Sequence, residues 1–224
     1  MTRQTFHAQL THLQERLLQL GAAAEVAVNK AVDSLEAQDL EEAQAVLDGD
    51  NELDRLQNEI EEDVLKLIAL QQPLARDLRT LGAILQTATD LERVGDYAEN
   101  IAERTLWIGK EPLIKPLVDI PKMARMSEAM LRDSLDCFVK RDVELAQKVV
   151  DDDEAVDQIY ATLFDELMEF VSSGNVITAR QAVQLLFVAR YLERIADHAT
   201  NVAERVIYMV TGEWIAHKHN TPNA

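Results

Sequence analysis

Two pairs of acidic residues stand at the same spacing in the two halves of this 224-residue chain. Glu92 and Asp96 are four residues apart, and Glu193 and Asp197 repeat the pair 101 residues later. Carboxylates at this spacing on a helix lie side by side and repel each other by about 0.2–0.5 kcal/mol. A divalent cation between them would remove that repulsion and use their oxygens as ligands. The matched pairs therefore predict two cation sites.

Further oxygen-bearing side chains share these two helix faces. At about 100° per residue, the acids of each half fall within an arc of about 60°. The predicted ligands are Glu92, Asp96, Glu99, Asn100 and Glu103 in the first half, and Glu193, Asp197, Asn201 and Glu204 in the second. Because Thr200 stands where the repeat would place a second Glu99, we expect the two sites to differ in affinity. All-oxygen ligation favours Mg²⁺, Ca²⁺, Mn²⁺ or iron over Zn²⁺, without selecting one.

The acids lie beside an apolar stripe and not within it. That stripe recurs every three or four residues, as in the seam of a helical bundle, at Ile84, Leu91, Val94, Ala98 and Ile101 and again at Leu185, Leu192, Ile195, Ala199 and Val202. We therefore expect the acids to form outward-facing strips, with no buried catalytic centre. A solvated acidic face, screened by neighbouring arginines and without any ion, remains the alternative. The duplication favours the cation sites, since a merely solvated face need not keep the same acids at the same phase.

Composition limits the class of partner. The chain has 22 basic and 40 acidic residues, a formal net charge of −18, which disfavours nucleic acid and anionic lipid. No apolar run approaches the roughly 20 residues that span a bilayer, so we expect no direct membrane insertion and a cytoplasmic location. The single Cys137 fits a reducing compartment and is expected in the core. His198, which replaces Tyr97 in the repeat, is expected to have a packing or surface role and not to bind metal.

Prolines, glycines and short polar turns divide each half into three long helices. The expected ranges are 6–38, 39–70 and 75–108, then 122–141, 142–171 and 178–211, with a weak point at 48–50. Short turns between long helices make neighbours antiparallel. The sequence therefore predicts an all-α fold of six helices in two units, residues 1–111 and 112–224.

Two other functional classes were weighed. A di-iron carboxylate enzyme needs inward-facing Glu-x-x-His pairs, and no histidine of this chain has a glutamate three residues before it. The sequence also lacks a nucleophile–base motif and a glycine-rich phosphate loop, so we expect no enzymatic activity. A helical scaffold protein that binds no metal remains an alternative function.

The chain resembles the PhoU family of phosphate-signalling regulators over nearly its whole length. The resemblance is carried by the two Glu-x-x-x-Asp pairs, by Gln71-Gln72-Pro73 followed by Arg76-Asp77-Leu78-Arg79, and by the stretch from Tyr191 to Asn201. It implies two tandem antiparallel three-helix bundles related by pseudo-twofold symmetry, with metal bound at the surface through the acidic motifs.

The resemblance also implies a function. A family member would be a negative regulator of the phosphate-starvation response and of phosphate uptake. It would connect the ATPase subunit of the phosphate ABC transporter with a membrane sensor histidine kinase, and protein partners would recruit it to the inner face of the membrane. A homodimer is expected, since symmetric bundles often pair through a twofold axis.

Overall fold

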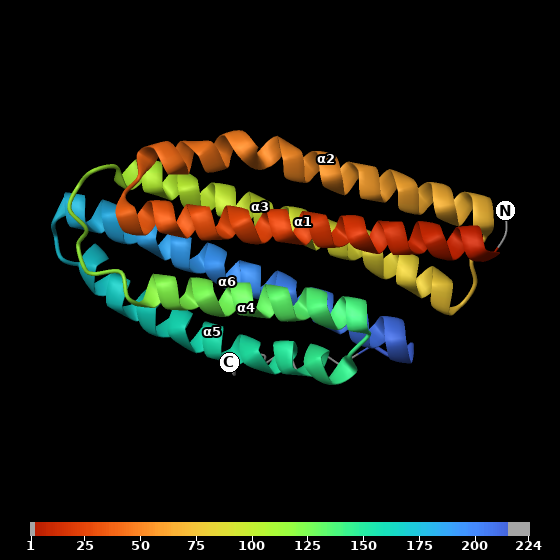
Figure 1. Ribbon diagram of the computed structural model, residues 1–224. Coiled ribbons are helices and arrows are strands. Elements are labelled where there is room, and N and C mark those ends of the chain that lie inside the picture. The colour runs from red at the N-terminus through yellow and green to blue at the C-terminus, as the bar shows by residue number, and fades with distance from the viewer. Residues whose placement is uncertain (1–2, 215–224) are drawn as a thin grey trace.

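The structure, a computed structural model, describes residues 3–214, and within them every regular element is a helix (Figure 1). The helices are α1 (Arg3–Ala37), α2 (Leu40–Gln71), α3 (Arg76–Ile108), α4 (Asp119–Lys140), α5 (Val143–Val171) and α6 (Val176–Thr211). The all-α prediction is confirmed, with every expected boundary within three residues. The predicted weak point at 48–50 is wrong: α2 continues through it, held on either side by the buried Val46 and Leu53.

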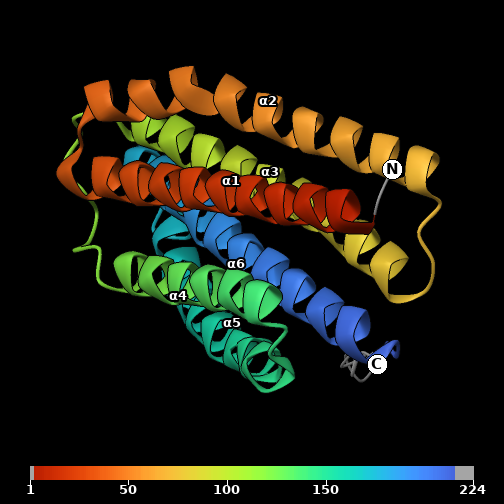
Figure 2. The same ribbon diagram turned by 45° about the vertical axis from the view of Figure 1, so that its right-hand side comes forward.

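The six helices form two tandem three-helix bundles. Within residues 3–214, α2 packs against α1 and α3 only, and α5 packs against α4 and α6 only. The halves meet through α3 against α6 and α1 against α4, so α2 and α5 lie on opposite outer sides (Figures 1 and 2). The contacts of α2 with α1 and α3 correspond to those of α5 with α4 and α6. The contacts between α3 and α6 and between α1 and α4 are each symmetric, as pseudo-twofold symmetry requires.

Polar caps begin three of the helices. Asp39 accepts hydrogen bonds from the backbone N–H groups of Glu41 and Glu42 at the start of α2. Asp142 and Asn175 cap α5 and α6 in the same way. Such caps satisfy backbone donors that have no partner within the helix. They fix where each helix starts, and hence the rotational phase at which its side chains meet the neighbouring helix.

The predicted seam is confirmed as the centre of the molecule. The stripe residues of α3 and α6 are completely buried: Ile84, Leu91, Val94, Ala98, Ile101, Leu185, Leu192, Ile195, Ala199 and Val202. Because α3 and α6 carry these stripes along facing sides, their acidic faces turn toward the flanks of the bundles. No helix within the described range is long and apolar enough to cross a membrane.

Candidate functional site

The acidic face of the second half lies between α5 and α6. Glu193 and Asp197 on α6 lie near Asp153 and Asp157 on α5, close enough for the four carboxylates to influence one another electrostatically. Glu193 is buried, with 8% of its surface exposed. The predicted outward orientation is therefore wrong for this residue, because α5 packs along the side of α6 that carries it.

Burial and repulsion by neighbouring carboxylates raise the pKa of three carboxyl groups on this face, those of Asp153, Asp157 and Glu193. Burial, with Asp157, Asp197, Glu193 and Glu204 adding repulsion, raises the pKa of Asp153 to about 7. Burial followed by Asp197 raises the pKa of Glu193. The more exposed Asp157 has its pKa raised by desolvation and by Asp197. Strongly raised carboxyl pKa values mark a place where a positive charge would be stabilised.

Arginines on α6 neutralise only part of this charge. Arg194 donates to Asp197 at 2.8 Å and its Nε lies 3.9 Å from Glu193 Oε2, and Arg190 forms an ion pair with the other Glu193 oxygen. Within residues 3–214, the buried oxygens Asp153 Oδ1 and Glu193 Oε2 nevertheless have no hydrogen-bond partner. Unpaired buried carboxylate oxygens are costly, so this face fits an additional cation.

In the first half the equivalent pair has a similarly placed arginine, but its glutamate is more exposed than Glu193. Glu92 and Asp96 are half-buried, and Arg93 reaches both, with its guanidinium nitrogens 3.6 Å from Glu92 and 2.7 Å from Asp96. Asn100 donates its side-chain amide to the Asp96 backbone carbonyl at 2.7 Å. Ordinary ion pairs and helix contacts thus engage the acidic face of α3.

The remaining predicted ligands are spread along the two helices. Glu99 lines a shallow pocket between α1, α2 and α3, and Glu103 pairs with Arg104 at 2.5 Å. Asn201 and Glu204 are half-buried on α6, and Glu204 adds to the repulsion at Asp153. Among residues 3–214, no three His, Cys, Asp or Glu side chains converge tightly enough to hold a metal ion. The carboxylates of the second half therefore interact electrostatically, but they do not converge on one point.

Asp153 and Asp157 are not among the ligands predicted from the sequence. The available signal was the four-residue spacing of Asp153 and Asp157, which repeats that of Asp50 and Asp54. These aspartates form a second acidic pair at helix spacing, on the helix that precedes the one with Glu193 and Asp197. Two such pairs on consecutive antiparallel helices indicate that two acidic faces meet.

A buried polar cluster joins the two halves. Asp90 on α3 is 5% exposed and lies between two side chains of α6. One of its oxygens is 2.7 Å from His198 Nδ1, and the other forms an ion pair with Arg205. Burial lowers the pKa of His198, so at neutral pH the imidazole is uncharged and its Nδ1–H donates to Asp90. His198 therefore packs in the interface between the halves, in agreement with its predicted role.

A family model described as the PhoU domain matches the chain twice, over residues 17–105 and over residues 120–206. The chain belongs to the PhoU family. The first match falls within α1–α3 and the second within α4–α6, so each three-helix bundle carries one PhoU domain.

Relatives and solved structures agree with this membership. The chain is 38% identical to a "Phosphate-specific transport system accessory protein PhoU homolog" of Clostridium acetobutylicum over 96% of this chain and 98% of the relative. It is 41% identical to the protein of the same name from Aquifex aeolicus, over 94% and 95%. PhoU from Pseudomonas aeruginosa superposes with a TM-score of 0.89 at 32% identity, covering 93% of this chain and 100% of that one. The phosphate transport system regulatory protein PhoU from Streptococcus pneumoniae gives 0.88 at 30%, over 95% and 100%.

Proposed function

We propose that this protein is a non-enzymatic regulator of phosphate uptake and a negative regulator of the phosphate-starvation response. Its relatives are named as accessory proteins of the phosphate-specific transport system, which supports the link to phosphate. The protein would act as an adaptor between the ATPase subunit of the phosphate ABC transporter and a membrane sensor histidine kinase. These partners would bring it to the inner face of the membrane, as a homodimer.

The observation that carries the regulator proposal is the PhoU-domain match in each half. The acidic face between α5 and α6, which its arginines compensate only in part, carries the cation site. We propose that Asp153, Asp157, Glu193 and Asp197 hold a divalent cation there. The oxygen donors suit a hard cation such as Mg²⁺ or Mn²⁺. Because these side chains do not converge on one point, the ion would keep part of its water shell, as Mg²⁺ commonly does. The first-half residues Glu92 and Asp96 would form a weaker site.

A cation on this face would change what the protein presents to a partner. The bound ion supplies positive charge that cancels repulsion between α5 and α6. The carboxylates would then be held in place, and the two helices would offer one ordered surface. An adaptor of this kind needs large rigid faces, which the long helices α1–α6 offer.

Calorimetric titration of the full-length, chelator-treated protein with Mg²⁺ and with Mn²⁺ tests the cation site. We expect saturable binding that weakens by about tenfold or more when Glu193→Gln and Asp197→Asn are combined. Asp151→Asn, on the exposed side of α5, is the matched control and should leave the affinity unchanged. Absence of saturable binding, or equal affinity in the double variant, would indicate a metal-free scaffold.

The adaptor role needs a separate measurement. The tagged protein is used to pull down detergent-solubilised membranes from phosphate-replete and phosphate-starved cells, probed for the transporter ATPase subunit and for the kinase. We expect both to be recovered, with at least one depending on phosphate supply. Recovery of neither in any condition contradicts the adaptor proposal without bearing on the cation site.

A further inference from the structure

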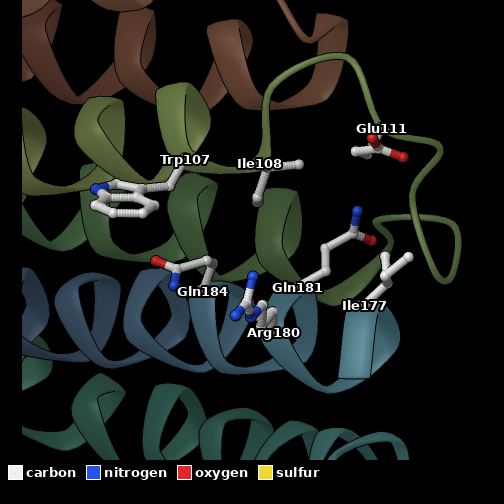
Figure 3. A pocket seen from close by; sticks show the side chains of 7 residues that line it. All are labelled: Trp107, Ile108, Glu111, Ile177, Arg180, Gln181 and Gln184. Atoms are coloured by element: carbon white, nitrogen blue, oxygen red, sulfur yellow. The ribbon is translucent and has the colours of Figure 1, made fainter. Parts of the chain in front are cut away.

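A groove opens where α3 ends and α6 begins. It has a volume of about 600 Å³ and lies beside the linker that joins the two halves. Its walls are Trp107, Ile108, Glu111, Ile177, Arg180, Gln181 and Gln184 (Figure 3). Trp107 and Ile108 come from α3, and Arg180, Gln181 and Gln184 come from α6 on the opposite side. The Trp107 side chain is 73% exposed, although tryptophan usually buries its large apolar surface.

Hydrogen bonds hold this groove open. The buried Gln181 accepts from the Ile114 backbone N–H at 2.5 Å and donates to the Pro112 carbonyl at 3.2 Å. From the other side, the Gln38 side chain donates to the carbonyls of Gly109 and Glu111 at 2.9 and 2.8 Å. These hydrogen bonds fix the linker in a position in which it leaves Trp107 exposed.

At the place related by the repeat, where α6 ends and α3 begins, the chain covers the equivalent residues itself. The repeat offset of 101 residues pairs Trp107 with Tyr208 and Arg180 with Arg79. Trp214 stacks on Tyr208, with ring centroids 4.1 Å apart and planes inclined by 13°. The chain turns there through Gly212, whose φ is 81°. A Cβ on Gly212 would lie 3.6 Å from the guanidinium carbon of Arg79, so this arginine also borders the covering segment.

This covered place shows which chemistry fits the open groove. Its covering segment is Gly212-Glu213-Trp214, an aromatic residue next to a carboxylate. In the open groove, Trp107 offers the ring on which an aromatic side chain would stack. Arg180 is exposed and forms no ion pair with any residue in the described part of the chain. On a chain of net charge −18, this groove places the positive charge of Arg180 near an exposed tryptophan, with Glu111 on the linker side. An aromatic ligand whose carboxylate reaches Arg180 would fit it.

We propose that the Trp107 groove is a docking site for a partner-protein segment that carries an aromatic side chain next to a carboxylate. The aromatic ring would stack on Trp107, and the carboxylate would pair with Arg180. The chain's own Trp214 is already stacked on Tyr208, so a second copy would have to give up that contact in order to dock its tail here. The proposal takes from the adaptor role only that a partner exists.

The probe is a fluorescently labelled peptide with the sequence of residues 211–224, titrated into the full-length protein and followed by anisotropy. We expect one bound peptide per chain, and a loss of affinity of about tenfold or more in Trp107→Ala. Trp107→Tyr, which copies Tyr208, should keep the affinity within about threefold. Arg180→Ala should weaken binding, and so should a peptide in which the residue equivalent to Trp214 is alanine.

Three results would overturn the proposal. The first is no saturable peptide binding, or equal binding to the wild-type protein and Trp107→Ala. The second is a dimer in sedimentation velocity that Trp107→Ala disrupts, because a second copy would then be the occupant. The third is Trp107-dependent binding to anionic phospholipid vesicles in place of the peptide. Calorimetric cation titration of Trp107→Ala keeps these failures separate from the proposed function, since that titration should match wild type whether or not peptide binds.

Discussion

The two acidic faces of this molecule carry the same residue pair in different surroundings. On α6, Glu193 and Asp197 lie near Asp153 and Asp157 of α5, and two buried carboxylate oxygens have no hydrogen-bond partner within the described residues. On α3, the equivalent pair is half-buried and reached by Arg93. Duplication has thus kept the spacing of the acids, while the packing around them determines how much charge stays uncompensated.

The same contrast appears where the halves meet. Asp90 holds His198 and Arg205 from the other half, whereas the repeat places Tyr191 at the equivalent position. Tyr191 stacks on Tyr97 with centroids 5.8 Å apart. One side of the pseudo-twofold axis is therefore joined by buried charge and the other by aromatic packing.

Removing the buried charge should have the largest effect. We expect Asp90→Ala to lower the free energy of unfolding by about 3 kcal/mol, because it leaves the half-buried Arg205 and His198 without their carboxylate partner. Tyr191→Phe, which keeps the stacked ring, should change it by less than about 0.5 kcal/mol. Urea unfolding followed by circular dichroism at pH 7 measures both. A cost below about 1 kcal/mol for Asp90→Ala would show that the buried ion pair does not hold the halves together.

The second-largest effect should be a difference in cation affinity between the two acidic faces. We expect Glu92→Gln combined with Asp96→Asn to weaken Mn²⁺ binding by less than about threefold, against about tenfold for the equivalent second-half pair. The reason is that Glu92 is more exposed than Glu193, so a cation at the first pair would relieve less desolvated charge. Calorimetric titration of both double variants measures the difference. Equal losses would mean that the two halves bind cations alike, despite their different surroundings.

The helices were predictable and the environment of the acids was not. Caps such as Asp39 and Asn175, and the apolar stripe through Leu91 and Leu192, are local signals, so the helix boundaries and the seam could be read directly. Those signals fix the phase of each helix about its own axis. They do not say which neighbour covers its flank, and α5 covers the flank of α6 that holds Glu193.

Stability against pH should show the uncompensated charge with a smaller effect. Since the pKa of Asp153 is about 7 in the folded protein and near 4 when unfolded, its favourable contribution is present below pH 4 and is lost as the pH rises through 7. We expect Asp153→Asn to stabilise the metal-free protein by ~1 kcal/mol at pH 8, and by much less at pH 4. Thermal unfolding in chelator across this range tests the sign, with Asp151→Asn as the control. Stabilisation that is independent of pH would contradict it.

The smallest effect lies in the packing beside the acids. A Cβ on Gly95 would come within 2.6 Å of Leu53 Cδ1. In the second half the equivalent residues are Ala196, at an offset of 101 residues, and Val156, at an offset of 103 residues, and both are completely buried. The first half thus fills this space with a small residue against a large one, Gly95 and Leu53. The second half fills it with two residues of intermediate size, Ala196 and Val156. Gly95→Ala gains up to about 1 kcal/mol of helix propensity and loses a similar amount through overpacking.

The exchange of volume predicts coupling between the two positions. Leu53→Val alone leaves a cavity, but in combination with Gly95→Ala the added methyl group fills part of it. We therefore expect the double variant to be about 1 kcal/mol more stable than the sum of the two single changes. A double-mutant cycle by urea unfolding measures this coupling. Additive effects would mean that the first half accommodates the methyl group by moving Leu53 alone, so that the paired substitutions in the second half did not arise as packing compensation.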